Sequence, residues 1–287
     1  AGYKLTEATG NTLIGRLAGE LLTTGSYNTA IGYNTMGDGV VTGSSNTAVG
    51  NSVMVAVTSG TGNTAIGEAS LATVSSGSYN VAVGMRSLQD NTADNNTAIG
   101  WGSLTDNTSG SYNTGLGRSA LALNTNGQKH TAVGYGALQN QNGGEENTAV
   151  GYLAGYNITT ASGSVAMGQE ALKTLQTGNF NVAIGRESLF SANGAADNVA
   201  VGKAAGTACT TGGNNVFIGK NAGYDATDAE KNVFVGASTR NDNAGTSSQV
   251  VLGFEARSQG GGYFTVGNSN SNWSRVDIGS TTWYSSS

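Results

Sequence analysis

The sequence predicts an all-β protein, a parallel β-solenoid or β-roll of 17-residue repeats that assembles with further copies of itself. Three observations carry this prediction. The motif N-T-A-[IV]-G recurs from Gly15 to Gly253, which is 238 residues in 14 intervals and therefore 17 on average. Small and apolar side chains alternate within each motif, and the chain has 46 Gly but no Pro. A fixed period in this range indicates a solenoid, a propeller or another repeat array.

The repeats divide the chain into three regions. Residues 1–10 form a lead-in or attachment segment, residues 11–253 form the repetitive shaft, and residues 254–287 form a C-terminal cap or tip, because the period stops after Gly253. A second glycine often falls ten residues after the first, as at Gly77 and Gly110. Each coil is therefore expected to consist of two short extended runs separated by glycine-marked turns.

The residue before each motif glycine is always apolar, and the one before that is usually Ala. Successive strand residues point to opposite faces, so one face shows Ile or Val and the other shows Ala. A coil of 17 residues at ~3.3 Å per residue has a small circumference. Its interior is therefore expected to accept Ala, Ser and Gly, but not Leu. The Ile/Val column, and with it the recurrent Leu column (for example Leu71 and Leu104), is then predicted to pack against other copies of the chain. The candidate packing residues are Ile31, Val49, Ile66, Val83, Ile99, Val133, Val150, Ile184, Val201 and Ile218.

An asparagine opens most motifs. Stacked at the ~4.8 Å spacing of β-coils, such amides can hydrogen-bond along the stack, and this structural role is favoured over ligand binding. The column comprises Asn28, Asn46, Asn63, Asn80, Asn96, Asn113, Asn147, Asn181 and Asn198.

Threonine follows the asparagine in many repeats and could indicate an ice-binding array. There is only one such Thr per coil, however, and the column changes to Val182 and Val199 downstream. Ice binding is therefore the least favoured function.

Composition excludes several classes of partner and site. A net charge of −5 argues against nucleic acid, which requires a basic surface. No apolar run approaches the ~18–20 residues of a membrane span. The single cysteine, Cys209, rules out a disulfide framework or a cysteine metal site within one chain.

Catalytic residues are not indicated either, and no cofactor is expected. His130 is the only histidine and occupies the asparagine position of its repeat, so it is interpreted as a substituted ladder position. Glu68, Glu170 and Glu187 follow the motif glycine on what should be a solvated turn. The stretch D-N-T-A-D-N-N at 90–96 is interpreted as a polar turn and not as a Ca²⁺ site, so no metal site is predicted.

Repeats of the form N-T-A-I-G-x-x-[AS]-L resemble those of bacteriophage tail fibres and, more loosely, the head repeats of trimeric autotransporter adhesins. The resemblance covers about residues 11–253. It implies a homotrimer, in which three copies around an axis would cover the Ile/Val columns.

The C-terminal stretch W-S-R-V-D-I-G-S-T-T-W-Y-S-S-S resembles the segment before the intramolecular chaperone of many phage fibres, which cuts itself off after a serine. The resemblance implies that Ser287 is a terminus generated by this cleavage. Aromatic residues gather in the same region and are either a plug of the solenoid or a receptor-binding tip. The receptor-contact candidates are Tyr263, Trp273, Arg275, Trp283 and Tyr284.

The expected function is that of a non-enzymatic fibre or spike shaft of a phage tail that mediates host attachment. Its expected partners are two further copies, other tail proteins and a host receptor, either a glycan or an outer-membrane component. A bacterial trimeric surface adhesin and a polysaccharide-cleaving tailspike are the alternatives.

Overall fold

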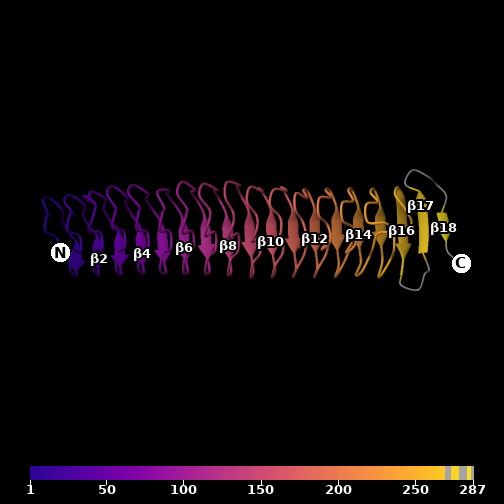
Figure 1. The fold of residues 1–287 in the computed structure, drawn as a ribbon, viewed down its shortest axis with the longest axis horizontal. Coiled ribbons are helices and arrows are strands. Elements are labelled where there is room, and N and C mark those ends of the chain that lie inside the picture. Colours follow the sequence, from indigo (N-terminus) through magenta and orange to yellow (C-terminus); the bar gives the residue numbers. More distant parts are fainter. Residues whose placement is uncertain (269–272, 278–282, 286–287) are drawn as a thin grey trace. The chain divides into compact units, whose positions relative to one another are not determined.

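The computed structural model describes residues 1–268, 273–277 and 283–285. The chain divides into two compact units, Ala1–Glu145 and Glu146–Ser287. Each unit is a stack of coils in which successive strands lie side by side, one strand per coil (Figure 1). The predicted parallel β-solenoid with 17-residue repeats is therefore confirmed.

The first unit contains eight strands of three residues each, and all of the pairings between them are parallel. Equivalent motif positions face one another, for example Thr12 with Thr29. Residues before the first strand stack on the next coil, where Gly2 N–H donates to Ala18 O at 3.1 Å and Thr6 N–H to Thr23 O at 3.1 Å. The strands are β1 (Thr12–Ile14), β2 (Thr29–Ile31), β3 (Thr47–Val49), β4 (Thr64–Ile66), β5 (Val81–Val83), β6 (Thr97–Ile99), β7 (Thr114–Leu116) and β8 (Thr131–Val133).

The second unit continues the same repeat and then changes direction. Parallel pairing runs through to β16, which pairs with β15. The last two strands instead pair antiparallel, β17 with β16 and β18 with β17. The strands are β9 (Thr148–Val150), β10 (Val165–Met167), β11 (Val182–Ile184), β12 (Val199–Val201), β13 (Val216–Ile218), β14 (Val233–Val235), β15 (Val250–Leu252), β16 (Tyr263–Gly267), β17 (Trp273–Asp277) and β18 (Trp283–Ser285).

The expectation of two extended runs per coil is wrong. Each repeat has one three-residue strand, and most of the remaining residues lie in turns and bends. The corners use left-handed backbone at non-glycine residues, such as Leu104 (φ 52°) and Tyr112 (φ 62°). The motif glycines are needed for a different reason. At Gly100 φ is +132°, and a Cβ would lie 2.6 Å from the backbone of Gly117 in the next coil, so only glycine fits there.

The expectation that the Leu column lies outside the coil is also wrong. Leu71, Leu88, Leu104, Leu121 and Leu138 are fully buried within the single chain. All five have φ values between 47° and 54°, so the alternation of side chains along an extended strand does not apply to them. The left-handed corner turns each leucine into the interior, where the alanines of the strands are also buried.

Large and small residues exchange places in the core of the second unit. Phe217 and Phe234 replace the inward alanine of β13 and β14, are fully buried, and stack with ring centroids 5.8 Å apart. Glycine stands at the leucine position after β12 and β13, as Gly206 and Gly223, and a Cβ there would lie 2.6 Å and 2.3 Å, respectively, from the Phe217 ring. The Phe217 ring therefore occupies space that a side chain at the leucine position would need.

Candidate interaction surfaces

The asparagines of the motif are buried and joined from coil to coil. Asn63 shows the pattern: its Oδ1 accepts from Asn80 N–H at 2.9 Å and from Asn80 Nδ2 at 3.1 Å, and its Nδ2 donates to Gly77 O at 2.8 Å. Side-chain or backbone bonds of this kind link successive members at Asn28, Asn46, Asn63, Asn80, Asn96 and Asn113 in the first unit, and at Asn181 and Asn198 in the second. Asn147 accepts from Ser164 N–H at 2.9 Å. These amides are occupied by the stack and are not exposed to a ligand.

A second amide column lies in the first unit and was not recognised in the sequence. Asn107 Nδ2 donates to Asn91 Oδ1 at 2.7 Å, and Asn124 Nδ2 donates to Asn107 Oδ1 at 2.8 Å. All three residues are fully buried. Their spacings of 16 and 17 residues were the available signal, but Asn91 stands in the polar stretch 90–96 and was interpreted with it as a turn.

The outward face of the strands carries an apolar stripe in each unit. The middle residue of nearly every strand is buried, whereas the first and third residues point away from the interior. Several third-position side chains are about two-fifths exposed, with Ile66 at 42 % and Ile218 at 41 %. The stripe comprises Ile31, Val49, Ile66, Val83, Ile99 and Val133 in the first unit and Val150, Ile184, Val201 and Ile218 in the second, all half-buried or exposed in the single chain. Large contiguous apolar patches are rarely exposed on a monomeric soluble protein.

Aromatic and basic side chains follow the stripe at the position after the motif glycine. In the first unit the Arg118 guanidinium lies 4.8 Å from the Trp101 ring centroid and 5.8 Å from that of Tyr135. Trp101 is 42 % and Tyr135 44 % exposed. Such cation–π contacts contribute about 0.5–1 kcal/mol each at exposed sites, and they hold the three side chains as one ordered column.

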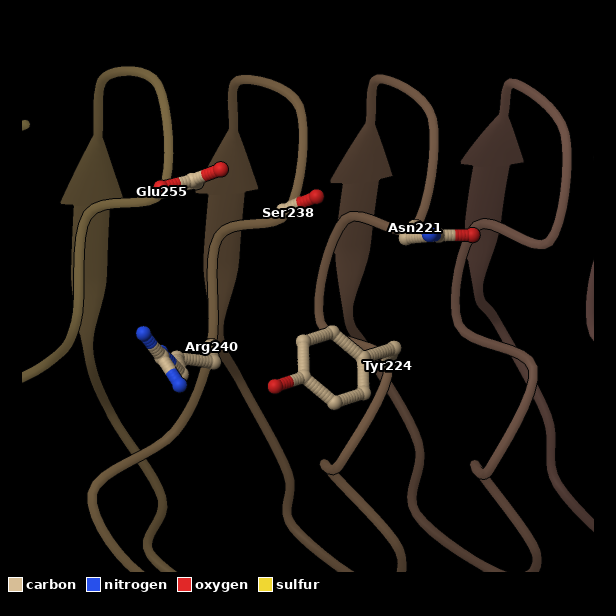
Figure 2. Close-up of a pocket in the computed structure, with 5 residues that line it drawn as sticks. All are labelled: Asn221, Tyr224, Ser238, Arg240 and Glu255. Carbon is tan, nitrogen blue, oxygen red and sulfur yellow. The ribbon is translucent and has the colours of Figure 1, made fainter. Parts of the chain in front are cut away.

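A cavity of about 380 Å³ opens on the second unit. Five side chains line it, Asn221, Tyr224, Ser238, Arg240 and Glu255 (Figure 2). Tyr224 is exposed and the other four are half-buried. The volume falls in the range of about 300–1,000 Å³ that is typical of small-molecule sites.

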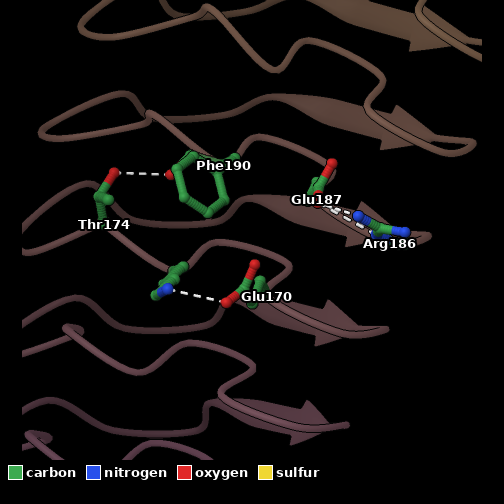
Figure 3. A network of polar contacts seen from close by, with 6 residues as sticks. Glu170, Thr174, Arg186, Glu187 and Phe190 are labelled. Carbon is green, nitrogen blue, oxygen red and sulfur yellow. Dashed lines mark hydrogen bonds and ion pairs between the residues drawn. The ribbon is translucent and has the colours of Figure 1, made fainter.

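Two carboxylates of the second unit that follow the motif glycine, Glu170 and Glu187, are paired with cations. Glu170 Oε1 lies 2.8 Å from Lys173 Nζ, and Glu187 Oε1 lies 2.7 Å from the Arg186 guanidinium (Figure 3). Lys173 also lies 5.5 Å from the ring centroid of Phe190. Glu68 in the first unit is exposed. Surface pairs of this kind contribute little to stability.

The side chains of His130 and Cys209 are buried in structural positions. Burial lowers the pKa of His130 to about 4 and raises that of the Cys209 thiol to about 12. His130 occupies the asparagine column, and its backbone N–H donates to Asn113 Oδ1 at 3.0 Å. Cys209 Sγ donates to Gly212 O at 3.4 Å. Burial, and after it the charge of Asp90, raises the pKa of Asp106.

Two classes of site are absent from the described residues. Residues 1–268, 273–277 and 283–285 contain no group of three His, Cys, Asp or Glu side chains placed to hold a metal ion. In the same part of the chain no helix is long and apolar enough to cross a membrane.

The predicted receptor contacts fall on the C-terminal strands. Tyr263 begins β16 and is half-buried, Trp273 and Arg275 lie on β17, and Trp283 and Tyr284 lie on β18. The antiparallel register sets Arg275 opposite Tyr284. The side chains on β17 and β18 that were named as candidates, and Ser287 itself, lie outside what the structure describes, so these assignments stay predictions.

Comparison with known proteins gives no relative from which a role can be transferred. No protein-family model, curated protein or solved structure matches the chain.

Proposed function

We propose that the chain is the shaft of a homotrimeric fibre or spike of a phage tail that mediates attachment to the host. The observation that carries this proposal is the apolar stripe. Along β2 to β8 the third strand residue is Ile, Val or Leu in every coil, and it remains half-buried or exposed in the single chain. Leaving such a column in water is unfavourable, because burial of apolar surface contributes about 25 cal/mol per Å².

The spacing of the stripe favours another copy of the same chain as its partner. Equivalent residues recur once per coil, and the coils are joined in register throughout each unit. A partner that covers the whole column must present side chains at the same spacing, and a parallel copy does so by construction. Three copies around an axis cover both the third-position column and the flanking Thr or Val column.

The oligomeric state tests this proposal. Analytical ultracentrifugation of the wild-type chain is expected to give the mass of three chains. The Ile99→Asp, Val133→Asp double variant should sediment as a monomer, because the assembled stripe would bury unpaired carboxylates. Leu123→Asp is the matched control, since Leu123 is 45 % exposed and lies off the stripe. A folded wild-type monomer contradicts the proposal.

Host attachment is tested separately with the assembled protein. Fluorescently labelled wild-type protein is expected to adsorb to host cells and to compete with intact virions. Normal adsorption by a stable Trp273→Ala, Trp283→Ala double variant would remove the C-terminal strands from the attachment surface.

A further inference from the structure

The cavity of the second unit lies where arginine replaces leucine in the core column, which is the set of residues four positions after each motif glycine. Four residues after the motif glycine, this unit has Leu172 and Leu189, both fully buried, in two of its coils. Arg240 stands at the same position in the coil of β14. Arg240 pairs with Arg257 in an isolated parallel bridge. Its backbone is not left-handed, unlike that of the leucines whose side chains point into the interior. The buried ring of Phe234 occupies the interior of that coil instead, and the arginine side chain lines the cavity.

The other lining residues come from neighbouring coils at repeated positions. Asn221, Ser238 and Glu255 each stand two residues after a motif glycine, so they form a row along one side of the cavity (Figure 2). Tyr224 and Arg240 lie across from this row, and the phenol oxygen of Tyr224 is directed toward the side of the guanidinium (Figure 2). One cavity therefore presents an aromatic ring, a guanidinium, a carboxylate, an amide and a hydroxyl.

The guanidinium keeps hydrogen-bonding capacity for a ligand. Arg240 Nε is buried and has no hydrogen-bond partner within the described residues. The structure also records no ion pair between Arg240 and Glu255 in that part of the chain. A buried N–H without a partner is unfavourable, and more so when the group is charged. Because Nε itself is closed to the cavity, a ligand oxygen would accept from the terminal nitrogens of this guanidinium.

The charge of the lining selects the type of molecule. One cation and one anion face the cavity, so the lining is neutral overall. A charged ligand would satisfy one of the two and oppose the other. An uncharged molecule with several hydroxyls can accept from Arg240, donate to Glu255 and do both with Asn221 and Ser238. The Tyr224 ring offers an apolar surface with a polar tip, which suits the flat face of a pyranose ring.

We propose that this cavity binds one neutral pyranose residue of a glycan. The assignment rests on the proposed role in host attachment, for which it names a ligand class and a site on the side of the coil stack. Arg240 and Glu255 bind the hydroxyls, and Tyr224 packs against the sugar ring.

The experiment titrates the purified full chain with methyl glycosides of glucose, galactose and N-acetylglucosamine, and with glucuronate for comparison. Isothermal titration and saturation-transfer NMR are the readouts. At least one neutral glycoside is expected to bind with a dissociation constant on the order of 1 mM, and glucuronate at least tenfold more weakly. Binding of glucuronate alone, or of no glycoside at 50 mM (roughly 50 times that constant), overturns the proposal.

Variants assign the binding to this cavity. Arg240→Leu restores the residue type of the core column and should weaken binding at least tenfold. Arg257→Leu, one coil further along the same column and outside the lining, should change binding less than twofold. Tyr224→Ala removes an exposed side chain, so it tests the site even if Arg240→Leu fails to fold, and it should also weaken binding at least tenfold. Equal losses in the Arg240 and Arg257 variants, or unchanged binding in Tyr224→Ala, contradict the assignment.

The outcomes also separate this proposal from the proposed function. If no neutral glycoside binds while the assembled protein still adsorbs to host cells, only the cavity assignment fails. If a glycoside binds at the cavity but the protein neither forms trimers nor adsorbs to cells, the attachment function fails and the sugar site stands.

Discussion

Removing one amide from the asparagine column should destabilise the first unit severely. Asn63 is fully buried, and Asn63→Ala leaves two backbone groups without their partners. These are the Asn80 N–H, which donates to Asn63 Oδ1 at 2.9 Å, and the Gly77 carbonyl, which accepts from Asn63 Nδ2 at 2.8 Å. Each orphaned buried group costs about 1–3 kcal/mol, so the expected loss is about 2–6 kcal/mol in the free energy of unfolding.

A second substitution separates the acceptor from the donor. Asn63→Asp keeps an oxygen for the Asn80 N–H but replaces the donor to Gly77 by a carboxylate oxygen. The carboxylate would then face two acceptors, the Gly77 carbonyl and Asn46 Oδ1, which now accepts from Asn63 Nδ2 at 3.1 Å. We therefore expect Asn63→Asp to be at least as destabilising as Asn63→Ala at pH 7, and to improve as the pH falls and the carboxyl becomes a donor.

Urea unfolding followed by circular dichroism measures both effects. The control is Asn51→Ala, because Asn51 is exposed and its side chain only accepts from Ser52 Oγ at 3.1 Å. That change should stay within about 0.5 kcal/mol of wild type. If Asn63→Ala unfolds at the same urea concentration as Asn51→Ala, the amide column does not stabilise the coil stack and the reasoning is refuted.

Three further predictions concern the contributions of His130, Gly117 and Phe217 to the stability of the fold. Since the folded pKa of His130 is lowered to about 4 from 6.5, the unfolded chain binds more protons between these values. Stability should therefore fall by up to about 3 kcal/mol as the pH drops from 6.5 to 4, and His130→Asn should lack this component in pH-dependent melting. Gly117→Ala should cost at least about 2 kcal/mol in urea unfolding, because φ is +135° and the new Cβ would lie 2.5 Å from a backbone oxygen of the next coil; a smaller loss would mean that the motif glycine is not sterically required. Phe217→Ala should cost about 3–5 kcal/mol, and adding Gly223→Leu should restore part of it, because φ at Gly223 is +60° and leucines of this column adopt nearly the same value. Additive losses in the double variant would show that the two positions do not share one space.

The periodic part of the fold was readable from the sequence because each strand coincides with its motif. The triplets before Gly32 and Gly100 are β2 and β6, and they pair in parallel register, 17 residues apart, with β1 and β7 respectively. Asparagine spacing likewise pointed to a stacked column. These features depend only on the order of residues along short extended segments.

The direction of side chains at the corners was not readable in the same way. Leu104 and its equivalents point inward because their backbone is left-handed, and that conformation is rare for leucine. The alternation of side chains along an extended strand therefore predicted the wrong face for these leucines. The cavity of the second unit was missed for a related reason, since Arg240 resembles an ordinary surface residue until the core column on which it stands is known.

The one-strand coil has a consequence for the response of a unit to tension. In the first unit the coils of β2 to β7 are held to one another by a similar set of parallel strand bonds and amide bonds. Tension applied between the two ends loads these interfaces in series, so coils should detach one at a time and not together. Each detached coil releases 17 residues, which extend to roughly 55–60 Å in place of the ~4.8 Å that the coil occupied in the stack. A unit under tension would thus lengthen by releasing one coil after another at nearly constant force, while the remaining coils keep their register.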